Sequence, residues 1–198
     1  MRNHLIHTML VFLAAVTTCG TSVPVFADAD PAPTATEVLS VMGQLKEERC
    51  LYNPHAKGCD RLGHFDKGPD AKRIAAAIAG AADGSLTGER RLDAALMATF
   101  SSYESGNKAD AVGDSGKAHG CFQMHYIDAD DAFDPARAAP LWRSLAVSSM
   151  KMGACATNPP DERLAGIAGS CVYPPARVKV RQRVQAARDA LAAAGAAD

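Results

Sequence analysis

The sequence predicts a mainly helical, all-α domain with a small irregular N-terminal segment. Of its 198 residues, 47% are hydrophobic and 22% are charged, which is a globular composition, and this length suits one domain with one core. Aromatic residues make up only 6% of the chain and alanine is plentiful, which favours helices over a β-sandwich or barrel. No segment shows the alternation of apolar and polar residues that is typical of strands.

Residues 1–27 are predicted to be a cleaved signal peptide. One early arginine precedes an apolar run at 5–16, and Val25 and Ala27 put small residues at the third-last and last positions before Asp28. The apolar run of about 12 residues is shorter than the roughly 20 that a membrane-spanning helix needs, although an uncleaved anchor is the alternative. We therefore expect a periplasmic or secreted protein with no stable membrane insertion after cleavage.

A linker at 28–36 leads into an N-terminal helix and loop region at 37–69. The helix is expected to open at Thr36, and the following loop, from Cys50 onward, is rich in Gly, Pro, Asn and His. Residues 71–82 are helical by composition, and Asp83-Gly84 stops them.

The strongest helical pattern runs from Thr87, its expected N-cap, to Gly106, its expected end. Apolar positions between Leu92 and Tyr103 follow the spacing i, i+3, i+4, i+7, i+8 and i+11. Such a stripe predicts a helix that buries one face in the core.

Three further helices are predicted in the second half of the chain. Asp134-Pro135 is an N-cap followed by proline at the first helical position, Asp161 opens a short helix, and Pro174 starts the last one. The alanine-rich end after Leu191 is expected to fray. The acidic run at 128–134 is interpreted as a solvated connection, because it lacks the ligand and glycine pattern of a calcium loop.

Five cysteines remain after the predicted cleavage. In an oxidising compartment they favour disulfides over metal ligands. Cys50 and Cys59 flank a loop of turn residues, and Cys155 and Cys171 bracket a loop near 15 residues, whose closure contributes about 3 kcal/mol in the chain-entropy model. Both pairs are predicted to be bonded, which leaves Cys121 as a buried, inert thiol.

Composition and spacing argue against several other functions. The formal net charge of −1 offers no electrostatic case for a nucleic-acid partner. The histidines and cysteines match no zinc spacing, so no metal and no cofactor are expected. A protease built on Cys121 and His125 is disfavoured, since nothing marks the thiol as an activated thiolate.

Glu104 is the candidate catalytic residue. It lies four residues after Phe100 and beside Tyr103, at the edge of the apolar stripe and in the last turn, where the helix dipole disfavours a carboxylate. Both placements favour the neutral carboxylic acid, which is the form that a general acid in glycoside cleavage needs. The alternative is an ordinary solvated glutamate at a helix end.

Three short segments follow this helix end in order: ESG at 104–106, AVGDSG at 111–116 and GCFQM at 120–124. Together they resemble the lysozyme-like lytic transglycosylases, which have Glu-Ser at a helix end, Ala-Val, a Ser/Asp-x-Gly turn and then Gly-Leu-Met-Gln. The spacing between Gly116 and Gly120 is similar to that of the goose-type and phage-like branch. The resemblance implies a lysozyme-like transglycosylase domain at 70–194.

By this resemblance Glu104 is the catalytic acid and base, and the substrate is the glycan strand of peptidoglycan. The implied reaction cleaves the MurNAc–GlcNAc β-1,4 bond and leaves 1,6-anhydro-MurNAc ends. Small residues after the helix would let the glycan pass close to the backbone. The implied substrate-binding residues are Ser105, Asp114, Gly120, Gln123 and Met124.

Two departures from the family pattern keep other functions open. His125 stands where goose-type enzymes often have an acid, and Ile167 stands where the family has a tyrosine that bonds the catalytic glutamate. A muramidase of the goose type would need a second carboxylate, for which Asp110 and Asp114 are the candidates. The other alternative is a catalytically weak cell-wall binding module of the same fold.

Overall fold

The computed structural model describes residues 30–196, so the predicted signal peptide at 1–27 lies outside the described residues. The helices are α1 (Ala35–Gln44), α2 (Arg49–Tyr52), α3 (Ala71–Ala81), α4 (Arg90–Ser105), α5 (Ala129–Phe133), α6 (Pro135–Met150), α7 (Gly153–Thr157) and α8 (Pro174–Gly195). Short 3₁₀ segments are η1 (Phe65–Lys67), η2 (Asp114–Gly116) and η3 (Pro160–Gly166). The predicted helical character is confirmed. Among the described helices, none combines the length and the apolar character that a bilayer span requires.

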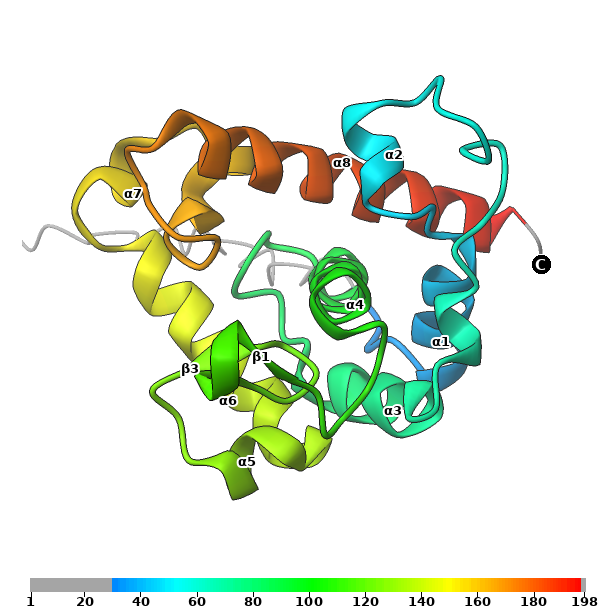
Figure 1. Cartoon of the computed structure of the whole chain (residues 1–198), viewed down its shortest axis with the longest axis horizontal. Helices are drawn as coiled ribbons and strands as arrows, with labels where there is room; N and C mark the ends of the chain where they lie inside the picture. The colour runs from blue at the N-terminus through cyan, green and yellow to red at the C-terminus, as the bar shows by residue number, and fades with distance from the viewer. Residues whose placement is uncertain (1–29, 197–198) are drawn as a thin grey trace, which may run out of the picture.

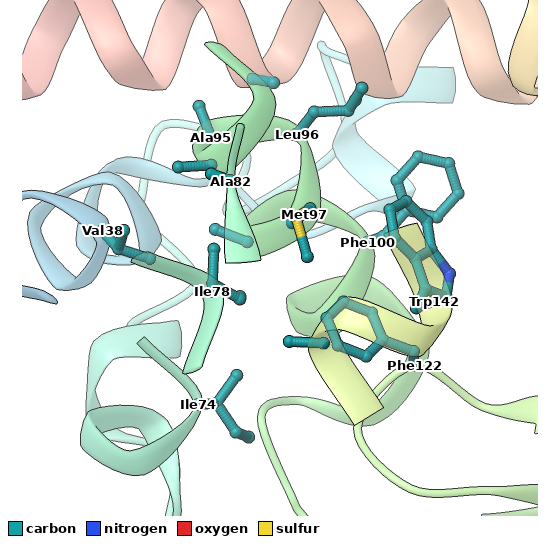
Figure 2. Packing of buried hydrophobic residues seen from close by; sticks show 14 of the residues in the cluster. Val38, Ile74, Ile78, Ala82, Ala95, Leu96, Met97, Phe100, Phe122 and Trp142 are labelled. Atoms are coloured by element: carbon teal, nitrogen blue, oxygen red, sulfur yellow. The ribbon is translucent and has the colours of Figure 1, made fainter. Parts of the chain in front are cut away.

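Helix α4 lies at the centre of the fold, with α8, α1 and α3 arranged around it (Figure 1). Every residue from Leu92 to Ser102 is buried, so this helix is covered on all sides over most of its length. Its apolar side chains meet those of α1, α3 and α6 in one core, which Figure 2 shows. Trp142 of α6 lies between two rings, with centroids 5.0 Å from Phe100 and 5.1 Å from Phe122.

Two helix starts differ from the prediction. Thr34, not Thr36, caps α1, because its side chain and that of Glu37 form a reciprocal capping box. Helix α4 begins at Arg90, and the predicted cap Thr87 lies before it. Thr87 instead donates its hydroxyl to the buried carboxylate of Asp93 (Oγ1 to Oδ1, 2.7 Å) and so fixes the entry to the helix.

A small antiparallel sheet follows α4, and the prediction of no strands was wrong. It consists of β1 (Val112–Gly113), β2 (Ala118–His119) and β3 (Met124–His125) in the order β1-β2-β3. Strands of two residues are too short to show an alternating pattern in the sequence.

Two further expectations for the second half of the chain were wrong. The acidic run forms α5, because the Asp128 side chain accepts a hydrogen bond from the Asp130 amide and caps it, so it is no mere solvated connection. Helix α8 continues past Leu191 to Gly195, because the small side chain of Ala194 is still buried against the core.

Both predicted disulfides are present. Cys50 bonds Cys59 with a Cα–Cα distance of 5.4 Å, and Cys155 bonds Cys171 with a distance of 4.8 Å. Cys121 is free and fully buried, as predicted, and burial raises the pKa of its thiol to about 12. It stays protonated at physiological pH, which makes it an inert core residue.

Candidate functional site

Glu104 lies where the buried helix α4 reaches the surface. Its side chain is 27% exposed, one turn after the fully buried Phe100. Gly106 ends the helix in the left-handed conformation (φ 65°), and its amide still donates to the Ser102 carbonyl at 3.0 Å. The amphipathic spacing thus leaves the carboxylate at the boundary between core and solvent.

Two cations of α8 contact this carboxylate. Arg183 Nη1 donates to Glu104 Oε1 at 2.5 Å, and Lys179 Nζ lies 3.7 Å from the same oxygen. The sequence analysis missed both residues, which are far from Glu104 along the chain. A signal was nevertheless available: Arg183 stands inside the apolar stripe of α8, next to Val184 and three residues after Val180, where a charge needs a buried partner.

The guanidinium of Arg183 is shared between two carboxylates. Besides Glu104 it contacts Glu48, at the start of α2, with Nε 2.8 Å and Nη2 2.7 Å from Glu48 Oε1. Its side chain is fully buried, and the guanidinium carbon lies 4.8 Å from the ring centre of Phe100 and 5.7 Å from that of Tyr103. Two carboxylates and two rings therefore surround one cation.

In the described part of the chain, neither Tyr103, which directly precedes Glu104, nor Tyr173 bonds the Glu104 carboxylate. The hydroxyl of Tyr103 is buried and has no hydrogen-bond partner within residues 30–196. Burial, with Glu48 nearby, raises the pKa of this phenol above its ordinary value, so it stays neutral. Tyr173 is exposed at the start of α8, and Ile167 is partly buried against the core. Arg183 is instead the strongest partner of Glu104.

The residues expected to bind substrate have mainly structural contacts. Ser105 Oγ donates to the Ser101 carbonyl at 3.0 Å and accepts from the Lys108 amide at 3.2 Å, so it stabilises the helix end. Gln123 Nε2 donates to the carbonyls of Gly120 (2.9 Å) and Ala111 (3.2 Å) and ties the loops of the small sheet together.

Gly120 and Met124 also serve packing. A Cβ on Gly120 (φ 76°) would lie 1.9 Å from the Ala132 carbonyl oxygen, so glycine is needed for the close approach of α5. This packing explains the glycine at position 120 without a glycan strand passing close to the backbone. Met124 is 5% exposed and belongs to the core.

Asp114, the first candidate for a second carboxylate, pairs with His125. Asp114 Oδ2 lies 2.8 Å from His125 Nε2, and both side chains are exposed. Asp110 is exposed in the loop before β1. Within residues 30–196, no hydrogen bond or ion pair joins Asp114 or His125 to Glu104 or to its two cations. Asp114 opens η2, directly after β1, and His125, one of the two departures from the family pattern, ends β3, so the pair links this turn to the third strand.

Asn107 is a further residue that the sequence analysis missed. It is fully buried in the left-handed conformation (φ 59°) directly after Gly106. Its Oδ1 accepts from Ser101 Oγ at 2.7 Å, and its Nδ2 donates to the Phe65 carbonyl at 3.0 Å. The Gly-Asn pair after a helix is a sequence signal for this turn. Asn107 fixes the chain immediately after Glu104.

A cavity of about 410 Å³ lies beside the same turn, between α1, η1 and α3, but Glu104 does not line it. Asp70, one of its lining residues, accepts the Ala109 amide at 2.9 Å. Within the described part, no group of three or more His, Cys, Asp or Glu side chains is placed to hold a metal ion.

Fold and site together define a mostly helical protein with a small antiparallel sheet, two disulfides and one partly exposed carboxylate at the end of a buried helix. No protein-family model matches the sequence, and neither a curated protein nor a solved structure is significantly similar to it.

Proposed function

We propose that the chain is an exported peptidoglycan lytic transglycosylase with Glu104 as its catalytic acid and base. The observation that carries the proposal is the position of Glu104: a partly exposed carboxylate at the end of the central helix, followed directly by a small three-stranded sheet. The segments that resemble the family lie at this helix end and in this sheet. Two disulfides are compatible with an extracellular or periplasmic location.

One carboxylate is sufficient for the proposed reaction. Glu104 gives a proton to the oxygen that leaves the anomeric carbon of MurNAc, and the glycosidic bond breaks. The same carboxylate then takes the proton of the substrate's own 6-hydroxyl, whose oxygen bonds the anomeric carbon. The proton has moved from one sugar oxygen to the other, and no water is consumed.

Hydrolysis by a goose-type muramidase is the first alternative. It needs a second carboxylate, about 5–5.5 Å away for retention or roughly 6.5–9.5 Å away with a positioned water for inversion. The pairing of Asp114 with His125 favours the single-carboxylate route, since it engages one of the two candidates.

A cell-wall binding module is the second alternative, and a specific observation favours it. Glu104 forms an ion pair with Arg183 and contacts Lys179, and Ile167 replaces the family's tyrosine. If Glu104 served only as a structural ion-pair partner, it would donate no proton. The domain would then bind glycan without cleaving it.

The test uses the exported protein on purified cell-wall sacculi. Glu104→Gln should keep the fold and lower release of muropeptides by about 10²–10⁴-fold, because an amide has no suitable proton to give. Glu89→Gln is the matched control, since Glu89 is exposed at the opposite end of α4 and its side chain forms no cap hydrogen bond.

Mass spectrometry of the products separates the three functions. Muropeptides one water lighter than their hydrolysed counterparts support the transglycosylase. Reducing ends alone would make the protein a muramidase, and co-sedimentation without release would make it a binding module. Near wild-type release by the Glu104→Gln variant would refute the catalytic assignment.

A further inference from the structure

We propose that Arg183 is the positioning residue of Glu104 and that Glu48 balances the charge of Arg183 while Glu104 exchanges its proton. This inference rests on the proposed function, since it concerns the same carboxylate. It assigns part of the site to α8 and part to the disulfide-bonded segment around α2, both outside the family-like segments at 104–124.

The position of the guanidinium is set by packing. Arg183 is fully buried beside Val180 and Val184, and its guanidinium lies close to the rings of Phe100 and Tyr103. A buried, planar guanidinium has little freedom to move, so its hydrogen bond fixes one oxygen of Glu104.

Lys179 is a looser contact of the same carboxylate. Its ammonium lies 3.7 Å from Glu104, beyond the range of a hydrogen bond, and its side chain is 35% exposed. It neutralises charge but does not fix geometry. Arg183 is therefore the residue that holds the orientation of Glu104.

Glu48 explains how Glu104 can accept a proton beside a buried cation. If Glu104 were the only partner, its protonation would leave the Arg183 guanidinium buried and unpaired, which is costly. Glu48 contacts the same guanidinium through Nε and Nη2, so Arg183 stays paired when Glu104 is neutral. The second carboxylate thus makes the acid form of Glu104 accessible.

The disulfide-bonded segment holds Glu48 in place. Glu48 directly precedes α2, two residues before Cys50, which is bonded to Cys59. Gln182, next to Arg183 in α8, donates its side-chain amide to the Leu51 carbonyl at 3.1 Å. Helix α2 is thus attached to α8 beside the cluster, and this segment is part of the candidate site.

Three elements contribute the charged and titratable groups that surround Arg183. Helix α2 and its preceding residue supply Tyr52 and Glu48. Partial burial raises the pKa of Tyr52, with Glu48 adding to it. Because both tyrosines stay neutral, the pH dependence comes from two carboxylates beside two cations. Among residues 30–196, this set is Glu48, Tyr52, Tyr103, Glu104, Lys179 and Arg183.

Charge-changing variants should shift the pH profile of kcat/KM in opposite directions. Glu48→Gln leaves the whole field of Arg183 acting on Glu104 and favours the carboxylate, so the alkaline limb moves to lower pH by about one unit. Arg183→Met leaves two carboxylates facing each other, so this limb moves to higher pH by about one unit. Arg183→Lys keeps the charge but loses the planar contact, so activity falls while the limb stays near its wild-type position.

Matched controls are available on the same elements. Glu47→Gln removes a neighbouring exposed carboxylate that pairs with Arg49, and Arg181→Met removes an arginine of α8 that pairs with Glu162. Neither should shift the limb. Equal shifts in Glu47→Gln and Glu48→Gln would overturn the proposal.

A readout without activity separates this inference from the proposed function. The ¹³C NMR signal of the Glu104 carboxyl, assigned by its loss in Glu104→Gln, gives its titration midpoint in each variant. The midpoint should fall in Glu48→Gln. This variant should fold even if Arg183→Met does not, because the partly exposed Glu48 side chain tolerates an amide. An unchanged midpoint refutes the coupling. If the wild-type protein cuts no sacculi but the midpoint still falls in Glu48→Gln, the proposed function alone is refuted.

Discussion

Removal of the Cys155–Cys171 bond should lower the free energy of unfolding by about 3 kcal/mol. The bond closes a chain segment with a sequence separation of 16. In the chain-entropy model a loop of this length restricts the unfolded state by roughly 10 cal/mol/K, which is about 3 kcal/mol at room temperature. Alanine is the appropriate replacement, since Cys155 is fully buried and a serine hydroxyl would need a hydrogen-bond partner.

Urea unfolding of Cys155→Ala/Cys171→Ala, followed by fluorescence, measures this loss. Trp142 is the only tryptophan, is 2% exposed and packs between Phe100 and Phe122, so its emission reports loss of the core. The urea m-value should also rise, because the unfolded chain becomes more expanded.

The same comparison in reducing buffer is the control. There neither protein has the bond, so the difference between variant and wild type should shrink to less than about 1 kcal/mol, which reports side-chain packing alone. A loss below about 1 kcal/mol in oxidising buffer, or an equal loss in both buffers, would refute the loop-closure reasoning.

Two further predictions concern buried titratable groups. Cys121 should resist alkylation in the native protein at about pH 8 and react on unfolding, because burial raises its pKa to about 12; fast native labelling would contradict this. Hydrogen bonds from Arg177, with Arg181, lower the pKa of Glu162, so its stabilisation is present above 4.5 and is lost as pH falls through its folded value. Glu162→Gln should therefore lose less stability than wild type between about pH 5 and about pH 3 in urea unfolding, and equal losses would contradict it.

Local signals predicted the five long helices, α1, α3, α4, α6 and α8, and both disulfides. Proline after Asp134 and glycine at 106 act through neighbouring backbone groups, so their effect can be inferred from the sequence alone. The start of α1 could also have been predicted, since Thr34 and Glu37 have the spacing of a capping box. The small sheet could not, because its two-residue strands depend on turns and on packing against α5.

The candidate site could be predicted only in part. The stripe of α4 placed Glu104 at the boundary of the core, because that position follows from helix periodicity. Its cations depend on the packing of α8 against α4, which no local pattern specifies. Arg183 could have been flagged as a buried charge in an apolar stripe, but its two partners could not have been named.

The long sequence separations inside the Arg183 cluster set an order of events during synthesis. Glu48 and Arg183 are 135 positions apart, and Glu104 and Arg183 are 79 apart. A chain made from its N-terminus can complete α4 while α8 has yet to emerge. A growing or C-terminally shortened chain therefore has Glu104 without the cation that holds it. The site is assembled by α8, after Glu48 and Glu104 have been made.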